Sequence, residues 1–460
     1  MYWPDKFSRL ARASPVRLWV LAFLILNLLA LESGGVVSMS RYAALRAMTD
    51  QHTFRIDDFV DWTVDWARTP DGHYYSNKAP GAVFLAFPLF WALDQACRLL
   101  PRCDQLDERG RRRPPGFMVQ TMISVSYQAI PFGLLCLLAV AVLNRNGATT
   151  AAMHFCALAL LFGNTAAIFM SSWFGHGITS CLVLSACLCL VYGRYFLLGL
   201  SIGLAVLCDY SAALLVPGFV CALVCAHRAN LFWIGPFLLG GAMPGVLWWW
   251  YHDSAFGSPF AIANQFQNPA FVYVADVPGN VWGIFAPVPS AHLLFELLLG
   301  STRGLLFTQP WVLVLLPASL ILATRSSGAL VERQLTLVCL IGFALLLWMN
   351  ASFGGWHGGL SAGPRYLSAI LPPFALLAGL QYRRLSFLVR ALLWITLFVA
   401  VGERGQIFAT TILAPREPLW AWQWQVLTSD DSLREWARLG TYWIVLMTAG
   451  WRLRERKTIT

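Results

Sequence analysis

The chain has 460 residues, of which 58% are hydrophobic and only 12% are charged, and its formal net charge is +10. Soluble globular proteins carry about 25% charged residues, so this composition excludes a soluble enzyme, a disordered chain and a nucleic-acid-binding domain. In a membrane protein, Lys and Arg concentrate in cytoplasmic loops, so the positive excess here is expected to report orientation.

Basic residues precede the first apolar segment, namely Lys6, Arg9, Arg12 and Arg17. The apolar segment is longer than that of a signal peptide, and no A-x-A cleavage site follows it. We therefore interpret it as an uncleaved first membrane helix with a cytoplasmic N-terminus.

Apolar segments long enough to cross a hydrocarbon layer about 30 Å thick recur along the chain. Helix is the expected conformation, because each spanning segment must satisfy its own backbone hydrogen bonds. The predicted fold class is an all-α polytopic membrane protein with about twelve transmembrane helices. The predicted spans are 17–37, 116–143, 149–170, 177–193, 195–208, 211–227, 231–251, 304–324, 334–349, 366–381, 386–402 and 438–451.

Segment 81–100 is also long enough to span, but it contains Pro88, Asp94 and Arg98. Charged side chains are costly in lipid. If this segment does not span, most of the remaining Lys and Arg fall in cytoplasmic loops, as the positive-inside rule requires. We therefore predict a helix that lies at, or dips into, the outer interface.

This topology divides the chain into a cytoplasmic N-terminus (1–16), a transmembrane catalytic region (17–402) and a C-terminal part (403–460). The catalytic region carries long outer loops at 38–115 and 252–303, and the C-terminal part holds an outer loop, the last span and a cytoplasmic tail. The polar loops with unusual residues all face outward. Transporters instead place polar groups at the bilayer midplane and often contain repeats, and no repeat is found here. An enzyme of the inner (plasma) membrane with an extracytoplasmic site is favoured.

Nine of the eleven cysteines lie in apolar segments, where a thiol behaves as a small hydrophobe. Cys97 and Cys103 lie near polar sequence, and whether they form a disulfide is left open. No CxxC metal spacing is present.

The first outer loop is rich in carboxylates, namely Asp50, Asp57, Asp58, Asp61, Asp65 and Asp71. Carboxylates at a membrane face can act as general bases or bind a cation, although for any single Asp a solvated acidic loop is the favoured interpretation, and the cluster carries the signal. Lys78 is the only lysine between Lys6 and Lys457. A lysine at this face suits phosphate as a point charge, with snorkelling to headgroups as the alternative.

Four further residues are candidates because of their place in the predicted topology. His176 lies just outside a span, and Asp209 separates two apolar segments, where a lone carboxylate suggests function. The alternatives are an interfacial histidine bonded to a carbonyl and a simple turn. His357 and Arg365 lie in the glycine-rich segment 350–366.

Arg303 begins an outer helix, and together with Arg365 and Lys78 it could clamp a phosphate or diphosphate. No nucleophile elbow, Walker motif, HExxH or Rossmann pattern is present.

The order of several short motifs resembles a bacterial branch of the GT-C membrane glycosyltransferases. This superfamily includes protein O-mannosyltransferases and the aminoarabinose transferase of lipid A. The motifs are HYYSNKAPGAVFLAFP, FGH, CDYSA, FGSPF, STRGLLFTQP and SAGPRYL. They cover about residues 17–380, and YYSNKAPG and GPRYL are the most specific.

The resemblance implies a GT-C arrangement with juxtamembrane helices in the first outer loop. It also implies inverting transfer of a sugar from a polyprenyl-phosphate donor to a lipid, glycan or protein acceptor. An acidic residue of the first loop would take the acceptor proton. Lys78 would lie near the donor phosphate, and His176, Asp209 and Arg365 match recurrent positions. No cofactor is required, and a divalent cation is left open.

One departure from the family concerns the base. Better-known relatives carry an acidic residue just before an Arg-Tyr pair, whereas Met39 and Ser40 precede Arg41-Tyr42 here. We therefore assign the base to Asp57, with Asp58 and Asp65 as alternatives. The rival functions are a transporter or flippase of a lipid-linked sugar and a polymerase or ligase of surface polysaccharide.

Overall fold

The computed structural model describes residues 16–30, 35–99, 106–108, 110–111, 113–227, 230–324, 329–359, 361, 363–410, 418–429 and 432–458. Within these ranges the chain is almost entirely helical, and the sheet consists of one antiparallel hairpin, β1 (Trp66–Arg68) and β2 (Tyr74–Ser76). The prediction of an all-α fold is confirmed.

The first half of the chain contains a helix that leads into the outer loop, a loop region with its own helices, and a series of apolar helices. In order these are α2 (Arg17–Leu29), α3 (Val36–Asp50), η1 (Asp57–Trp62), α4 (Gly81–Arg98), α5 (Phe117–Ser124), η2 (Val125–Ala129), α6 (Ile130–Arg145), α7 (Thr150–Leu161), α8 (Thr165–Ile168), α9 (Gly175–Val191), α10 (Tyr195–Cys208), η3 (Tyr210–Leu215) and α11 (Val216–Ala226).

The second half continues the bundle and adds short helices between its members. These are α12 (Ile234–Phe256), η4 (Ala263–Phe266), η5 (Pro269–Phe271), α13 (Ala291–Leu299), α14 (Leu305–Thr308), α15 (Pro310–Thr324), α16 (Leu330–Ser352), η6 (Arg365–Leu367), α17 (Leu371–Gln381), η7 (Tyr382–Arg384), α18 (Phe387–Thr410), α19 (Leu419–Thr428) and α20 (Leu433–Thr458).

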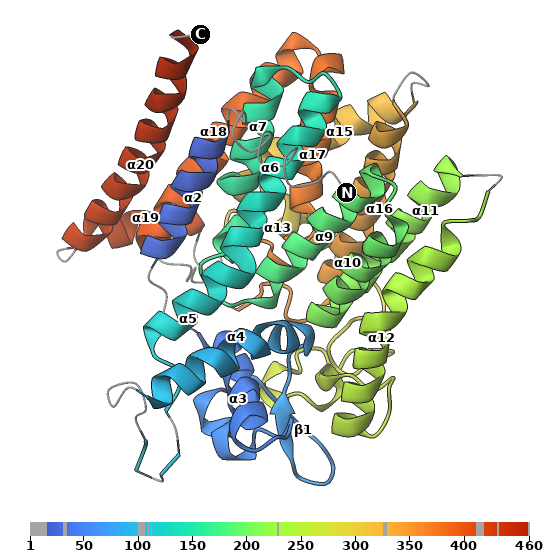
Figure 1. Cartoon of the computed structure of the whole chain (residues 1–460), viewed down its shortest axis with the longest axis vertical. Coiled ribbons are helices and arrows are strands. Elements are labelled where there is room, and N and C mark those ends of the chain that lie inside the picture. The colour runs from blue at the N-terminus through green and yellow to red at the C-terminus, as the bar shows by residue number, and fades with distance from the viewer. Residues whose placement is uncertain are drawn as a thin grey trace.

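The first outer loop gathers at one end of the helix bundle, at the bottom of Figure 1, where α3, α4 and β1 lie together. The opposite end carries the turns that the sequence places in the cytoplasm. There the Arg383 guanidinium donates to the carbonyl of Gly147 (2.8 Å), and Arg145 lies over the ring of Tyr192. The polar loop region and these basic turns therefore occupy opposite ends of the bundle.

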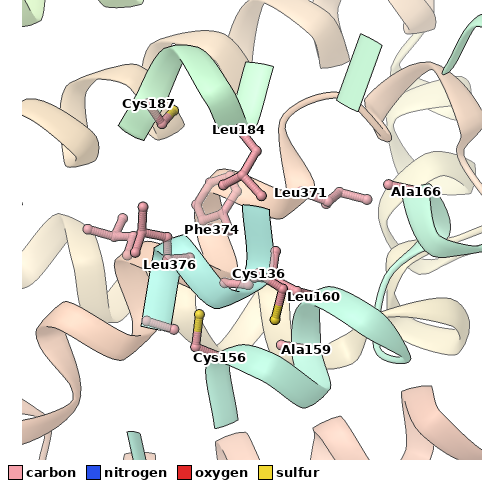
Figure 2. Packing of buried hydrophobic residues seen from close by; sticks show 14 of the residues in the cluster. Cys136, Cys156, Ala159, Leu160, Ala166, Leu184, Cys187, Leu371, Phe374 and Leu376 are labelled. Carbon is pink, nitrogen blue, oxygen red and sulfur yellow. The ribbon is translucent and has the colours of Figure 1, made fainter. Parts of the chain in front are cut away.

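Buried apolar side chains from distant helices form the core of the bundle (Figure 2). Leu160 of α7, Leu184 of α9 and Phe374 of α17 pack together there. Cys136 and Cys156 lie among them as free, fully buried thiols, as expected for small hydrophobes.

Among the residues that the structure describes, two helices are by themselves long and apolar enough to cross a membrane, the continuous helix Phe117–Arg145 and α16. Six further apolar helices are shorter than that test requires, and the predicted total of twelve spans stays a prediction. The predicted span 149–170 is not one helix, because α7 ends at Leu161 and α8 begins at Thr165. Cys103 lies outside the described residues, so its pairing with Cys97 stays open.

The predicted end of a span at 402 is too early, because α18 continues through two charged residues to Thr410. Both charged residues have partners. Arg404 donates to the carbonyl of Ala167 (3.0 Å), and Glu403 accepts from the Gln423 amide (2.8 Å). The region 403–437 is therefore not a simple loop, since it contains the end of α18, α19 and the start of α20.

Segment 81–100 forms the predicted helix, α4, and packs on α3. Its charges face α3. The carboxylate of buried Asp94 accepts from Arg46 (2.5 Å) and from Arg98 (3.0 Å), and Arg98 also reaches Asp50 (3.2 Å). The charges that argued against a spanning helix therefore join α4 to its neighbour in the outer region.

We predict that Asp94→Ala destabilises the protein by about 3–5 kcal/mol, because it leaves the buried Arg46 guanidinium without its closest carboxylate. Chemical unfolding in detergent measures this. Asp61→Ala is the matched control, since Asp61 pairs with Arg111 while 48% exposed and should cost about 0–1 kcal/mol. Equal losses for the two variants would contradict a structural role for the Asp94 pair.

Candidate active site

A cavity of about 170 Å³ lies where the first outer loop meets the outer ends of the bundle helices. Its charged lining comes from five separate parts of the chain. These residues are Arg41 of α3, Lys78 before α4, His176 and Asp209 at the ends of α9 and α10, and Arg365 of η6. The remaining lining includes Asn77, Tyr210, Asn264, Phe353 and Tyr366.

Arg41 is brought to the cavity by α3 and is only 5% exposed. Its guanidinium packs against the start of α9. A Cβ added at Gly175 would lie 2.7 Å from Arg41 Nη2 and 3.0 Å from the Cys208 carbonyl. Glycine at this position of the FGHG segment is therefore required by the close approach of the arginine.

Lys78 is held by a carboxylate of the same loop. The β1–β2 hairpin pairs Trp66 with Ser76, which brings Asp65 beside Lys78, and the Lys78 Nζ to Asp65 Oδ2 distance is 3.2 Å. The Ser40 hydroxyl of α3 donates to the Asp65 carbonyl (2.6 Å). Lys78 is thus fixed to both the hairpin and α3.

Burial and charge act in opposite directions on this pair. Burial lowers the pKa of Lys78 below its ordinary value, and Asp65 offsets only part of that effect. Burial alone would raise the pKa of Asp65, but Lys78 and then Arg365 outweigh it and lower the pKa. Asp65 therefore stays ionised and keeps a positive charge at Lys78.

Arg365 reaches the cavity from the glycine-rich segment 350–366. It donates to the Tyr366 hydroxyl (2.9 Å) and its guanidinium carbon lies 4.9 Å from the centre of that ring. Gly358 has φ +65°, and a Cβ there would lie 2.8 Å from Arg365 Cδ and Nε. The glycine therefore both makes the turn and leaves room for the arginine.

Arg41 and Arg365 form no ion pair with any described residue, and the Nε atom of each is buried without a hydrogen-bond partner there. Burial lowers the pKa of Arg41 to about 10, against the opposing effect of Asp209. Buried cations are costly unless a partner compensates them. The buried Arg41, the half-buried Arg365 and Lys78 around one cavity form an arrangement that suits an anion with several oxygens, such as a phosphate.

Arg303 and His357 do not line this cavity but brace the glycine-rich segment behind it. Arg303 is 4% exposed and donates to the Gly359 carbonyl (2.6 Å), and His357 Nδ1 accepts from the Gly359 amide (3.0 Å). Burial, and then the charge of Arg365, lowers the pKa of Arg303 to about 10.

His176 and Asp209, which are 33 positions apart in sequence, meet at the cavity wall. The distance from His176 Nδ1 to Asp209 Oδ2 is 2.8 Å. The other oxygen of Asp209 accepts from the amide (3.1 Å) and the hydroxyl (2.7 Å) of Ser211. The two residues singled out separately in the sequence form one pair.

The other carboxylates predicted for the site lie elsewhere. Asp57 is 40% exposed, contacts His73 Nδ1 (2.7 Å) and accepts from the Tyr74 amide (2.6 Å). Asp58 is exposed and accepts from the Gln51 amide (2.5 Å). Neither residue, nor Asp65, is among those lining the cavity. Of the predicted residues the cavity thus unites Lys78, His176, Asp209 and Arg365.

Arg41 is the charged cavity residue that the sequence did not select as a site candidate. Its signal was the Arg-Tyr pair at the start of the loop, which drew notice only for the missing acid before it. Tyr42 is buried and packs against Trp173, with the ring centres 4.7 Å apart and the rings tilted. The pair therefore combines one anchoring ring with one cation aimed at the cavity.

A second cavity of about 370 Å³ lies farther out, between the first loop and the end of α12, with Phe54, Arg55, Tyr75 and Trp250 among its lining. A narrow space of about 10 Å³ shares Phe54 and Met48 with it and reaches Lys78. Within the described part of the chain, no three His, Cys, Asp or Glu side chains gather as metal ligands.

No protein-family model and no curated protein sequence matches the chain. Solved structures do match. ArnT from Cupriavidus metallidurans bound to undecaprenyl phosphate aligns with 96% of this chain and 72% of its own, at 16% identity and TM-score 0.52. The apo state of ArnT gives 15% identity and the same coverage and TM-score. An Archaeoglobus fulgidus oligosaccharyltransferase aligns with 92% of this chain and 60% of its own at 13% identity, with a TM-score of 0.48.

We predict that affinity for a phosphate monoester falls as pH rises through the lowered pKa of Lys78, hence below its ordinary 10.5. Only the protonated amine holds the anion. Because the folded pKa is the lower one, the unfolded chain binds more protons in this window and stability rises with pH there. Deprotonation of Lys78 in this pH range therefore does not destabilise the fold, so the expected loss of affinity is not caused by unfolding through this group.

Lys78→Arg should move the alkaline loss of affinity to higher pH, because guanidinium stays protonated. Thermophoresis of the detergent-purified protein across a pH series measures both variants. A loss of affinity at the same pH in Lys78→Arg would assign the titration to another group.

Proposed function

Because the chain has the fold of the GT-C membrane glycosyltransferases, we propose that it transfers a sugar from a polyprenyl-phosphate donor to an acceptor on the extracytoplasmic side of the inner membrane. The observation that carries this proposal is the group of three cations around one cavity, namely the buried Arg41 and the half-buried Lys78 and Arg365. A polyprenyl phosphate supplies the anion that this group lacks.

The donor class is also supported by the ArnT structure, which contains undecaprenyl phosphate. In the proposed complex the phosphate lies between Lys78 and Arg365, and the apolar chain extends along the outer ends of the bundle helices. Negative charge grows on the phosphate as the bond to the sugar breaks. Cations fixed before the reaction stabilise that charge without reorganising.

The second cavity is proposed to receive part of the sugar or acceptor. Its aromatic walls, Phe54, Tyr75 and Trp250, suit the apolar faces of a sugar ring, and Arg55 adds a donor at its edge. The acceptor class remains a lipid, glycan or protein.

The carboxylates of the first loop take different parts in this proposal. Asp65 positions Lys78 through the 3.2 Å ion pair. Asp57 stays the sequence-based assignment for the base, with Asp58 as its neighbour, although both lie outside the cavity lining. No step of the proposed reaction requires a divalent cation, and transfer in EDTA tests that alternative.

We predict that purified protein in nanodiscs transfers labelled sugar from an undecaprenyl-phosphate donor and releases undecaprenyl phosphate. Arg365→Met should weaken donor binding by about 10–100-fold, because a charge-assisted hydrogen bond contributes about 1.5–3 kcal/mol. Arg111→Met is the control, since Arg111 pairs with Asp61 and Asp107 away from the cavity.

The products distinguish the rival functions. A flippase moves the intact donor between leaflets and leaves the sugar–phosphate bond unbroken. A polymerase or ligase transfers an assembled glycan rather than a single sugar. Either result, or equal donor affinity in the two arginine variants, would contradict the proposed function.

A further inference from the structure

We propose that His176, oriented by Asp209, is the general base that takes the proton of the acceptor hydroxyl. This inference rests on the proposed function and deepens it. It moves the base from the carboxylates of the first loop to the outer ends of the bundle helices α9 and α10.

The Asp209 carboxylate is held in place by contacts other than the one with His176. It ends α10 in extended backbone, and its Oδ1 accepts from the Ser211 amide and hydroxyl at 3.1 and 2.7 Å. Its Oδ2 lies 2.8 Å from His176 Nδ1. A carboxylate held at both oxygens cannot swing away, so it determines the orientation of the imidazole.

The pairing also determines the tautomer. An ionised carboxylate only accepts hydrogen bonds, so Nδ1 of His176 carries the proton. Nε2 then presents a lone pair, and no described residue donates a hydrogen bond to it. Phe169 and Tyr366 hold the ring, each with its centre 5.5 Å away. His176 lines the cavity with Lys78 and Arg365, so the free nitrogen belongs to the wall of the anion site.

A nearby histidine shows the contrast. His252 is fully buried and does not line the cavity. Its Nδ1 lies 2.8 Å from the Trp248 carbonyl and its Nε2 lies 3.0 Å from the Tyr210 hydroxyl. Both nitrogens are occupied by the protein, as expected for a structural histidine, whereas His176 has only one occupied.

The first-loop carboxylates are less suited to the step. The Asp65 carboxylate is paired with Lys78, and Asp57 is bonded to His73 and to the Tyr74 amide. Neither the Asp57 nor the Asp65 carboxylate lines the cavity. The acid missing before Arg41-Tyr42 is therefore replaced from another part of the chain.

The proposed transfer step is an inverting displacement. The acceptor oxygen attacks the anomeric carbon while its proton passes to His176 Nε2. The bond from the anomeric carbon to the phosphate oxygen breaks, and its electron pair stays on the phosphate, held by Lys78 and Arg365. The imidazolium formed is stabilised by Asp209, and it loses its proton to water after the product leaves.

The charges around His176 oppose one another. Burial disfavours the imidazolium, Asp209 favours it, and Arg365 and Arg41 across the cavity disfavour it. The neutral base is thus present before the reaction, and the new positive charge has a partner. Transfer should therefore be lost at acidic pH, when Nε2 is protonated.

The test compares His176→Asn with His227→Asn. An asparagine amide can replace Nδ1 and keep the hydrogen bond to Asp209, but it has no basic nitrogen at the Nε2 position. We expect His176→Asn to keep its melting temperature and its affinity for undecaprenyl phosphate, and to lose about 10²–10⁴-fold in kcat. His227 is bonded to Tyr195 outside the cavity, and its substitution should leave kcat unchanged.

Two further readouts separate catalysis from a structural role. The acidic limb of the kcat/KM profile should disappear from the residual activity of His176→Asn, and added imidazole should restore part of the rate. Full activity in His176→Asn, loss of its phosphate affinity or melting temperature, or abolished transfer in Asp57→Asn alone would overturn the assignment. If wild-type protein transfers no sugar, the proposed function itself fails.

Discussion

The rest of this structure depends on a group of cations that are largely removed from water at the edge of an apolar helix bundle. Arg41, Lys78 and Arg365 gather around one cavity, and among the described residues only Lys78 forms an ion pair. Such a group of cations is energetically unfavourable when no anion is bound to it. The surrounding structure holds it in place through the Asp65 pair, the packing of α3 on α9, and the turn at Gly358 that admits Arg365.

Much of the fold follows from the sequence because bilayer thickness limits helix length. The predicted span 195–208 coincides with α10, and the charges of 81–100 correctly indicated a helix outside the bundle. The end of α18 was not predictable in this way. Arg404 continues the helix because the Ala167 carbonyl, more than two hundred residues away, accepts its hydrogen bond. Local patterns carry no information about such distant partners.

The site residues that could be predicted are those whose residue type or local setting is rare in this sequence. Lys78 is a lone lysine and Arg365 follows five glycines, so both stood out, and so did His176 and Asp209. Which carboxylate faces the cavity depends on side-chain direction instead. Asp57 and Asp65 have the same chemistry, yet one contacts solvent and His73 while the other is buried against Lys78. Arg41 was overlooked because its Arg-Tyr pair was read only for the acid missing before it, and the sequence does not show that the guanidinium reaches the cavity.

The origin of the cavity from segments far apart in the chain has a consequence for biosynthesis. Arg41 and Lys78 are made early, and Lys78 pairs with Asp65 within the same loop, so the first loop region can balance part of its charge alone. Arg365 follows nearly 290 residues after Lys78 and arrives only after α16 has been inserted. A ribosome must therefore complete most of the bundle before all the charged side chains of the cavity can meet.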